Sequence, residues 1–113
     1  ADVGIIPYPP ELIGVMNNKN SSRVKSTARA VLLMSLGLPI IVSPLESYTE
    51  LIKHGENGFI ARSAQDWIDY ISLLRDNPKL RKVMGLNGRE TVIKDYSNES
   101  QTSQYLAIFN NLL

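Results

Sequence analysis

The chain has 113 residues, of which 43% are hydrophobic, and this is enough for one modest domain with a buried core. Its formal net charge of +1 excludes a chain that binds nucleic acid through its overall charge, and it also excludes an acidic tail. The absence of cysteine excludes disulfides and cysteine-containing zinc sites, and it favours a reducing compartment.

Two further observations concern membranes and the start of the chain. The longest apolar run, residues 31–42, is too short to cross a bilayer and is interrupted by Gly37 and Pro39. The first residues show no signal-peptide pattern and lead directly into a strand-like stretch. Because the chain also begins without Met, we expect it to be part of a longer protein.

The first half of the chain predicts a strand, a helix and a second strand. Residues 2–7 are typical of a short buried strand, and residues 11–20 predict a polar loop. We expect a helix from about residue 28 to residue 36, with Gly37 as its C-terminal stop. The apolar run 39–42 is typical of a parallel strand that is buried on both faces.

The second half predicts one more strand among four helices. A short helix over 48–54 is followed by a strand over 58–61. Two longer helices are expected over 64–76 and 78–94, and a final helix is expected from Ser97 onward. We expect most of the helical residues to lie in this C-terminal part of the chain.

The two longer helices carry capping and apolar patterns. Ser63 can cap the first of them, with Asp66 placed for a capping box, and Pro78 suits the first position of the second. We expect the following apolar residues to pack in the core: Trp67, Tyr70, Ile71, Leu74, Leu80, Val83 and Met84.

The alternation of strands and helices predicts the fold class. Buried strands separated by helices imply an α/β fold with a parallel sheet and right-handed crossovers. Three strands are fewer than a doubly wound domain normally contains. We therefore expect a partial Rossmann-like sheet with flanking helices, corresponding to the second half of such a domain.

Basic residues gather in one stretch of the chain. No acidic residue occurs between Glu11 and Glu46, whereas Lys19, Arg23, Lys25 and Arg29 all lie in that interval. Such a local excess of positive charge favours an anion, although a solvated basic face is the alternative.

This stretch predicts a binding site for a diphosphate-sized anion. We expect the helix to open at Ser26 or Thr27, where unpaired N–H groups and the helix dipole favour negative charge. Lys25 adds a point charge, and Arg29 adds a planar set of donors that suits phosphate. Ser43 follows the next strand, and ligands of open parallel sheets bind at the carboxyl ends of the strands.

The sequence offers no evident catalytic or metal-binding group. His54, the single histidine, is expected to place a cation at the end of a short helix. One histidine without cysteine leaves no convincing transition-metal site. No nucleophile elbow, P-loop or dinucleotide fingerprint occurs.

Three segments resemble a known family almost from end to end: "ADVGIIPYP", "RVKSTARAVLLMSLGLPIIVSPLESYTELIKHGENGFIA" and "LRDNPKLRKVMGLNGRETVIKDYS". They are similar to the C-terminal, nucleotide-sugar-binding domain of family 4-type glycosyltransferases with the GT-B architecture. The most specific matches are Gly37-x-Pro39, Ser43-Pro44, Glu50 and Gly55-x-Asn57-Gly58.

The resemblance implies a donor site for a nucleotide sugar, which is a substrate rather than a cofactor. It implies that residues 25–29 approach the diphosphate and the donor sugar, and that residues 43–47 border the same cleft. Glu50 matches a residue near the start of the next helix, where a helix N-terminal charge and a ligand contact are the two alternatives. The resemblance also implies a cytoplasmic enzyme of glycan biosynthesis, with any association with the inner membrane face made by parts outside this chain.

The sequence also departs from the family pattern. Many members carry two Glu with seven residues between them, and the matching positions here are Val24 and Leu32. A subgroup carries a Lys-Ser-x-Asn-Arg pattern instead, which Lys25, Ser26 and Arg29 match, whereas Ala28 stands at the Asn position. The contacts usually made by the two Glu are therefore not implied.

Residues 1–113 would accordingly form the second half of the donor-binding domain, and the N-terminal acceptor domain would lie elsewhere. Such a chain is expected to be inactive by itself. A non-catalytic anion-binding or protein-interaction module is the alternative, and an exposed sheet edge at residues 3–7 would favour self-association. A sugar-nucleotide epimerase of related architecture is a third interpretation, for which no specific residues are present.

Overall fold

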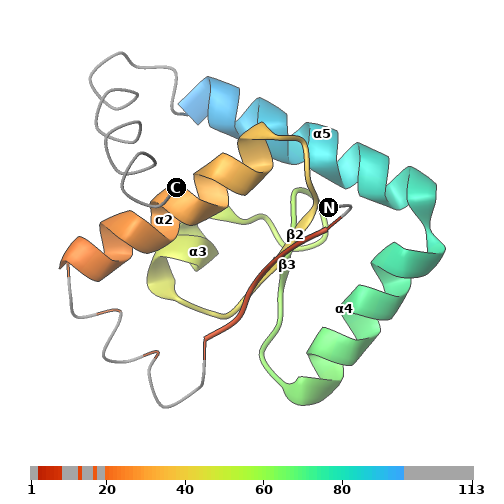
Figure 1. Ribbon diagram of the computed structural model, residues 1–113, viewed down its shortest axis with the longest axis horizontal. Coiled ribbons are helices and arrows are strands. Elements are labelled where there is room, and N and C mark those ends of the chain that lie inside the picture. The colour runs from red at the N-terminus through yellow and green to blue at the C-terminus, as the bar shows by residue number, and fades with distance from the viewer. Residues whose placement is uncertain (1–2, 9–12, 14–16, 18–19, 96–113) are drawn as a thin grey trace.

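The structure is a computed structural model that describes residues 3–8, 13, 17 and 20–95 (Figure 1). The helix expected from Ser97 onward lies outside the described residues. Within the described part of the chain, no helix is both long enough and apolar enough to cross a membrane.

Three short parallel strands lie at the centre of the molecule. They are β1 (Gly4–Ile6), β2 (Ile40–Val42) and β3 (Phe59–Ile60), and they are hydrogen-bonded in the order β1-β2-β3. Each predicted strand is confirmed, although each is shorter than expected. The α/β fold with a three-stranded parallel sheet and flanking helices is likewise confirmed.

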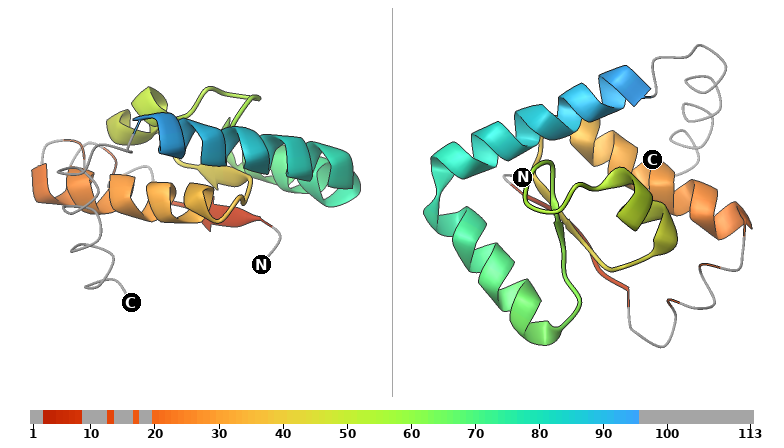
Figure 2. Two further views of the ribbon diagram at one scale, coloured as in Figure 1. Left: turned by 90° about the horizontal axis from the view of Figure 1, so that it is seen from above. Right: turned by 180° about the vertical axis from the view of Figure 1, so that it is seen from behind.

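Among the described residues, four helices surround the sheet: α2 (Asn20–Ser35), α3 (Glu46–Leu51), α4 (Ala64–Asp76) and α5 (Pro78–Asp95). Helices α2 and α4 lie on opposite sides of the strands (Figure 1). Helix α5 runs past the amino end of the sheet, where the strands begin, and it contacts both α2 and α4 (Figure 2).

The central strand β2 is buried on both faces, as its continuous apolar run predicts. Ile40 and Val42 pack in one core cluster with residues of α2, α3 and the second half of α5. Ile41 points to the opposite face, where it packs with Leu74 of α4 and Met84 of α5. Because both faces are covered, each side chain of β2 is removed from water.

Helix α2 begins at Asn20, two turns earlier than predicted. Neither proline nor glycine occurs between residues 20 and 27, so nothing in this stretch breaks a helix. Ala28 is fully buried, which shows that packing extends into the early turns. Ser26 and Thr27 are therefore interior helical residues, and their predicted role as the N-cap is wrong.

The predicted stop at Gly37 is confirmed. Gly37 adopts a φ of 76°, which residues with a Cβ rarely adopt. The N–H of Leu38 donates to the carbonyl of Leu33 at 3.3 Å, and the N–H of Gly37 donates to the carbonyl of Met34 at 2.9 Å. These two bonds form a Schellman motif, which ends α2 and turns the chain into β2.

Helix α3 spans Glu46–Leu51 and not residues 48–54. It begins directly after Pro44-Leu45, and the carbonyl of Leu45 accepts the N–H groups of residues 48 and 49. It ends early because Ile52 is extended and the side-chain oxygen of Asn57 accepts the N–H of Lys53 at 2.8 Å. The chain therefore leaves the helix three residues sooner than its apolar pattern suggests.

His54 consequently lies outside α3, and its expected role as a charge at the helix end is wrong. Its Nδ1 accepts the N–H of Ile60 at 3.0 Å, and its Nε2 lies 3.2 Å from the hydroxyl of Tyr70. Because Nδ1 accepts, the neutral ring carries its proton on Nε2 and donates it to Tyr70. Phe59 stacks on Tyr70 with ring centroids 4.4 Å apart, and His54 meets both rings edge-on.

Helix α4 occupies the predicted residues and begins as predicted. Ser63 Oγ accepts the N–H of Asp66 at 3.1 Å, whereas the carboxylate of Asp66 accepts the N–H of Arg62 at 2.9 Å. This arrangement resembles a capping box, except that the carboxylate reaches one residue further back.

The predicted core of α4 and α5 is confirmed at most positions, but not at Ile71 and Val83. Both of these side chains are exposed. The buried faces of the two helices are centred on Leu74 and Met84, which leaves the two residues turned away from the sheet.

Helix α5 lies against the C-terminal end of α2 at a pair of glycines. A Cβ placed on Gly85 would overlap the carbonyl oxygen of Gly37 and lie 2.9 Å from its carbonyl carbon. The same substitution at Gly88 would meet only ordinary contacts, the nearest at 3.5 Å. Gly85 is therefore required by close backbone packing, whereas Gly88 is merely tolerated.

We predict opposite effects of alanine at these two glycines. Gly85→Ala should lower the free energy of unfolding by about 1–3 kcal/mol, because the clash outweighs the better helix propensity of alanine. Gly88→Ala should leave the stability unchanged or raise it by up to about 1 kcal/mol. Urea denaturation followed by circular dichroism measures both, and equal effects would contradict the close contact.

Candidate functional site

The carboxyl end of the sheet is where the chain leaves all three strands. Tyr8 follows β1, Ser43 follows β2 and Ala61 follows β3. In an open parallel sheet this end gathers the loops that bind ligands. A hollow of about 280 Å³ lies there. Its lining residues are Tyr8, Ile13, Ser43, Pro44, Ala61, Arg62, Ser63, Ala64 and Trp67.

Ser43 holds the backbone of Tyr8, which follows β1, by hydrogen bonds. Its buried hydroxyl accepts the N–H of Tyr8 at 2.7 Å and lies 3.3 Å from the carbonyl oxygen of Tyr8, to which it donates. The backbone N–H of Ser43 donates to the carbonyl of Ile6 at 3.1 Å, which extends the pairing of β1 with β2. The side chain predicted to contact a ligand therefore positions Tyr8.

Arg29, which lies on α2, also contacts Tyr8. One terminal nitrogen of its guanidinium donates to the hydroxyl of Tyr8 at 3.3 Å. Arg29 is exposed, and this contact uses one of the five N–H donors that an arginine carries. The structure thus joins Arg29 and Ser43, two predicted site residues that are 14 positions apart, through the side chain and the backbone of Tyr8.

The remaining basic and hydroxyl residues lie within α2 and not at its start. The structure describes the backbone of Lys25 and Ser26, and it places both in the second turn of the helix. Their N–H groups accordingly donate within the helix. The unpaired N–H groups of a first helical turn, which were predicted at these residues, are therefore not found there. Thr27 is half-buried beside them. Lys25 precedes Arg29 by four residues, which is about one turn of α2.

Glu50 is exposed on α3, at the fifth of the six residues of that helix. It therefore lies in the last turn, and the interpretation of Glu50 as a helix N-terminal charge is wrong. The acidic residue of the first turn is Glu46, whose N–H donates to the side chain of Asn17 at 3.0 Å.

Tyr8 is the residue of this site that the sequence analysis missed. It lies among the prolines of "PYPP", directly after the strand predicted over residues 2–7. The available signal was its position immediately after a buried strand, where side chains reach the ligand-binding end of the sheet. Trp67 was assigned to the core, and it both packs there and lines the hollow.

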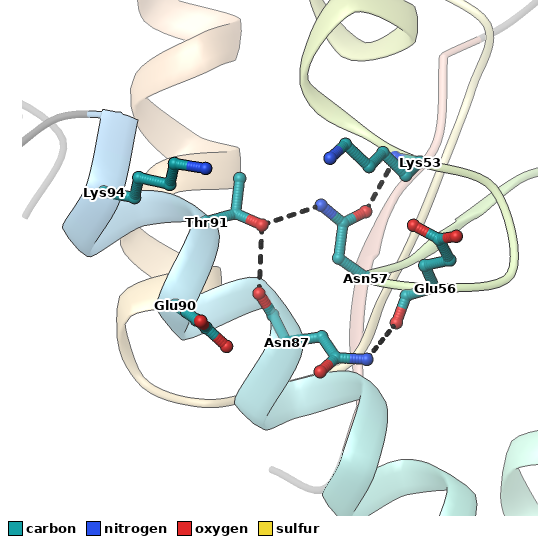
Figure 3. A pocket seen from close by; sticks show the side chains of 7 residues that line it. All are labelled: Lys53, Glu56, Asn57, Asn87, Glu90, Thr91 and Lys94. Carbon is teal, nitrogen blue, oxygen red and sulfur yellow. Dashed lines mark hydrogen bonds between the residues drawn. The ribbon is translucent and has the colours of Figure 1, made fainter.

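A second and larger hollow lies at the opposite end of the sheet, between the turn before β3 and α5 (Figure 3). Its volume is about 450 Å³. It is lined by Lys53, Glu56, Asn57, Asn87, Glu90, Thr91 and Lys94. Charges of both signs border it, so its lining favours neither anions nor cations.

Asn57 forms the buried wall of this second hollow. Its side-chain amide donates to the carbonyl of Leu51 at 3.4 Å and to the hydroxyl of Thr91 at 3.1 Å, while its oxygen accepts the N–H of Lys53. Asn87 adds a bond from α5 to the carbonyl of Glu56 at 2.9 Å (Figure 3). Because these side chains bond to the chain itself, we interpret their role as structural. We call this set of hydrogen bonds the clasp, since it holds α5 against the turn before β3.

No group of three histidine, cysteine or acidic residues that could hold a metal ion occurs among the described residues. The candidate site is therefore the hollow at the carboxyl end, with Tyr8 and Ser43 in its lining and Arg29 bonded to the hydroxyl of Tyr8.

A family model described as "Glycosyl transferases group 1" matches residues 30–91, which are more than half of the chain. The chain belongs to this family. The matched region runs from the second half of α2 to α5 and includes Ser43 and Glu50, and it begins directly after Arg29.

Two curated proteins also resemble this glycosyl transferase chain. A protein named trehalose synthase from Pyrococcus horikoshii is 30% identical over 76 residues, which are 67% of this chain and 18% of that protein. A protein named N-acetyl-alpha-D-glucosaminyl L-malate synthase from Bacillus anthracis is 30% identical over 83 residues, 71% of this chain and 22% of that protein. The chain thus spans about a fifth of the length of these relatives. No solved structure matches it at the same level of significance.

We predict that Ser43 stabilises the border of the hollow at the carboxyl end of the sheet. Ser43→Ala leaves the N–H of Tyr8 without its partner and should cost about 1–3 kcal/mol of unfolding free energy. The control is Ser35→Ala, which removes an exposed hydroxyl that bonds to the carbonyl of Leu32. That variant should change stability by less than about 0.5 kcal/mol in the same denaturation assay. Equal losses in the two variants would contradict the role of Ser43.

We also predict that the clasp at Asn57 is structural. Asn57→Ala leaves three groups of the chain without their partner and should lower the unfolding free energy by about 3 kcal/mol. Asn87→Ala removes one bond at a half-buried position and should cost only about 1 kcal/mol. Thermal denaturation of both variants checks this order, and the reverse order would refute the interpretation.

Proposed function

We propose that the protein containing this chain transfers a sugar from a nucleotide-sugar donor, and that residues 1–113 form the second half of its donor-binding domain. The proposal assigns it to the family 4 type with GT-B architecture. It rests on membership of the group 1 glycosyl transferases together with one observation, namely the contact between Arg29 and Tyr8 at the carboxyl end of the sheet.

The geometry supports a site for the donor diphosphate. Arg29 reaches from α2 to the hydroxyl of Tyr8, and Ser43 holds the backbone of Tyr8 beside the hollow. A guanidinium can bind two phosphate oxygens at once, because its donors lie in one plane. Lys25 lies one turn earlier on α2 and would add a second positive charge.

The chemistry assigned to these residues is electrostatic. When the bond from sugar to phosphate breaks, negative charge develops on the departing diphosphate. Arg29 and Lys25 stabilise that charge, and groups held in place before the reaction do so most effectively. Ser26, Thr27 and Glu50 complete the set of residues that we assign to the border of the donor site.

The acceptor site and any catalytic base belong to other parts of the protein in this proposal. It includes no resident cofactor, and it places the enzyme in the cytoplasm in glycan biosynthesis. A non-catalytic anion-binding module is the alternative, and it would bind nucleoside diphosphates while the protein containing this chain transfers no sugar.

We expect Arg29→Ala and Lys25→Ala each to weaken the binding of a nucleoside diphosphate at least tenfold, which corresponds to about 1.4 kcal/mol. Isothermal titration calorimetry with a panel of nucleoside diphosphates measures the effect. Lys53→Ala is the matched control, since it removes an exposed positive charge at the opposite end of the sheet.

The control should change the affinity by less than about twofold, because charges beyond the screening length contribute little at physiological salt. Unchanged affinity in both Lys25→Ala and Arg29→Ala would refute the site. Diphosphate binding without transfer by the protein containing this chain would instead favour the non-catalytic module.

A further inference from the structure

Helix α5 carries a second row of side chains that faces away from the rest of the molecule. Its members recur every three or four residues, which places them on one side of the helix. We name this row the outer face of α5. It consists of Lys79, Lys82, Val83, Leu86, Arg89 and Ile93, all of which are exposed, and it is bordered by Glu90, which also lines the second hollow.

The apolar members of the outer face are unusually open to solvent. Val83 is 47% exposed, Leu86 is 55% exposed and Ile93 is 59% exposed. The opposite side of the same helix packs on the protein through Met84 and Gly85. Helix α5 is therefore apolar on two sides, and only one of them contributes to the described core.

The charged members of the outer face are basic. The face carries three basic residues, Lys79, Lys82 and Arg89, and is bordered by one acidic residue, Glu90. Arg81, by contrast, turns inward and donates to the carbonyls at the end of α4, so it does not belong to this surface. Positive charge and open apolar side chains thus coincide along about 21 Å of helix, given a rise of 1.5 Å per residue.

We propose that the outer face of α5 binds the surface of a membrane that contains anionic lipids, with the helix lying parallel to that surface. Val83, Leu86 and Ile93 would enter the boundary between headgroups and acyl chains, as apolar residues of interfacial helices do. Lys79, Lys82 and Arg89 would contact lipid phosphates while their aliphatic stems remain near the apolar layer.

The combination of residues favours this partner over two others. A nucleic acid would match the basic residues but would gain little from three spaced aliphatic side chains, because its affinity comes mainly from phosphate contacts. A protein partner would match the aliphatic residues, but the cores of protein interfaces are depleted of lysine, and two of the three basic residues on this face are lysines. An anionic bilayer surface matches both kinds of residue at once.

The position of α5 allows such a contact. The helix runs along the outside of the molecule in each view, and no described element covers its outer face (Figures 1 and 2). This inference does not depend on the proposed donor site, whose residues lie at the carboxyl end of the sheet.

Co-sedimentation of the chain with lipid vesicles tests the proposal. Vesicles of equal parts phosphatidylglycerol and phosphatidylcholine should bind the chain at least tenfold more strongly than vesicles of phosphatidylcholine alone. Raising the salt from about 0.05 M to about 0.5 M should weaken that binding several-fold, since the screening length shortens.

Two variants and two matched controls locate the surface. Lys82→Glu should reduce binding to the anionic vesicles at least fivefold, whereas Lys53→Glu, with the same charge change elsewhere, should not. The double variant Leu86→Gln with Ile93→Gln should also weaken binding, whereas Ile68→Gln with Leu73→Gln on α4 should not. The six side chains exchanged in these four variants are exposed, so circular dichroism should show unchanged folding.

Three results would overturn the proposal. The first is an absence of binding to anionic vesicles at low salt. The second is an equal loss in the variants and in their controls, because binding would then depend on net charge or overall hydrophobicity. The third is a chain that ignores lipid but forms a dimer which Leu86→Gln with Ile93→Gln abolishes in sedimentation velocity, since the face would then be a protein interface.

Discussion

The close approach of Gly37 and Gly85 is the contact on which the arrangement of the helices depends. The Schellman motif turns the chain sharply at the end of α2, so the carbonyl of Gly37 projects toward α5. Only a residue without a Cβ lets α5 lie directly on it. From this position the first half of α5 packs on the face of the sheet that α4 covers, and its second half packs against α2. The contact between Gly37 and Gly85 therefore allows α5 to pack against both core clusters at the amino end of the strands.

The sequence predicts those elements best whose limits are set by local chemistry. Helix α4 begins where Ser63 can accept an N–H, and α2 ends where only glycine suits the backbone, so both limits are readable from single residues. The start of α2 was not readable, because Ser26 suits a cap and a helix interior alike, and burial of Ala28 decides between them. The contact of Arg29 with Tyr8 was equally hidden, since it joins residues 21 positions apart across two elements.

One motif that indicates the family, Gly55-x-Asn57-Gly58, lies at the amino end of the sheet. The residues that we assign to donor binding lie at the opposite end. In Gly55-x-Asn57-Gly58, Gly55 has a φ of 84°, Asn57 bonds three groups of the chain, and a Cβ on Gly58 would lie 3.0 Å from a backbone oxygen of β2. These requirements are all structural, so this motif reports the fold. The diphosphate contact that we propose rests instead on Arg29, which precedes the region that the family model matches.

The hydrogen bond from Ile60 to the ring of His54 also determines the direction in which the sheet can be extended. In β3 the N–H of Ala61 points to β2, so the N–H of Ile60 points to the open side of the strand, where the imidazole accepts it. The N–H of Gly55 binds the carbonyl of Gly58 on the same side. An incoming strand would find these two groups already occupied. Among the described strands, by contrast, β1 has a neighbour only on its β2 side. Of the two edges that the described strands form, the one beside β1 is therefore where a further strand could pair.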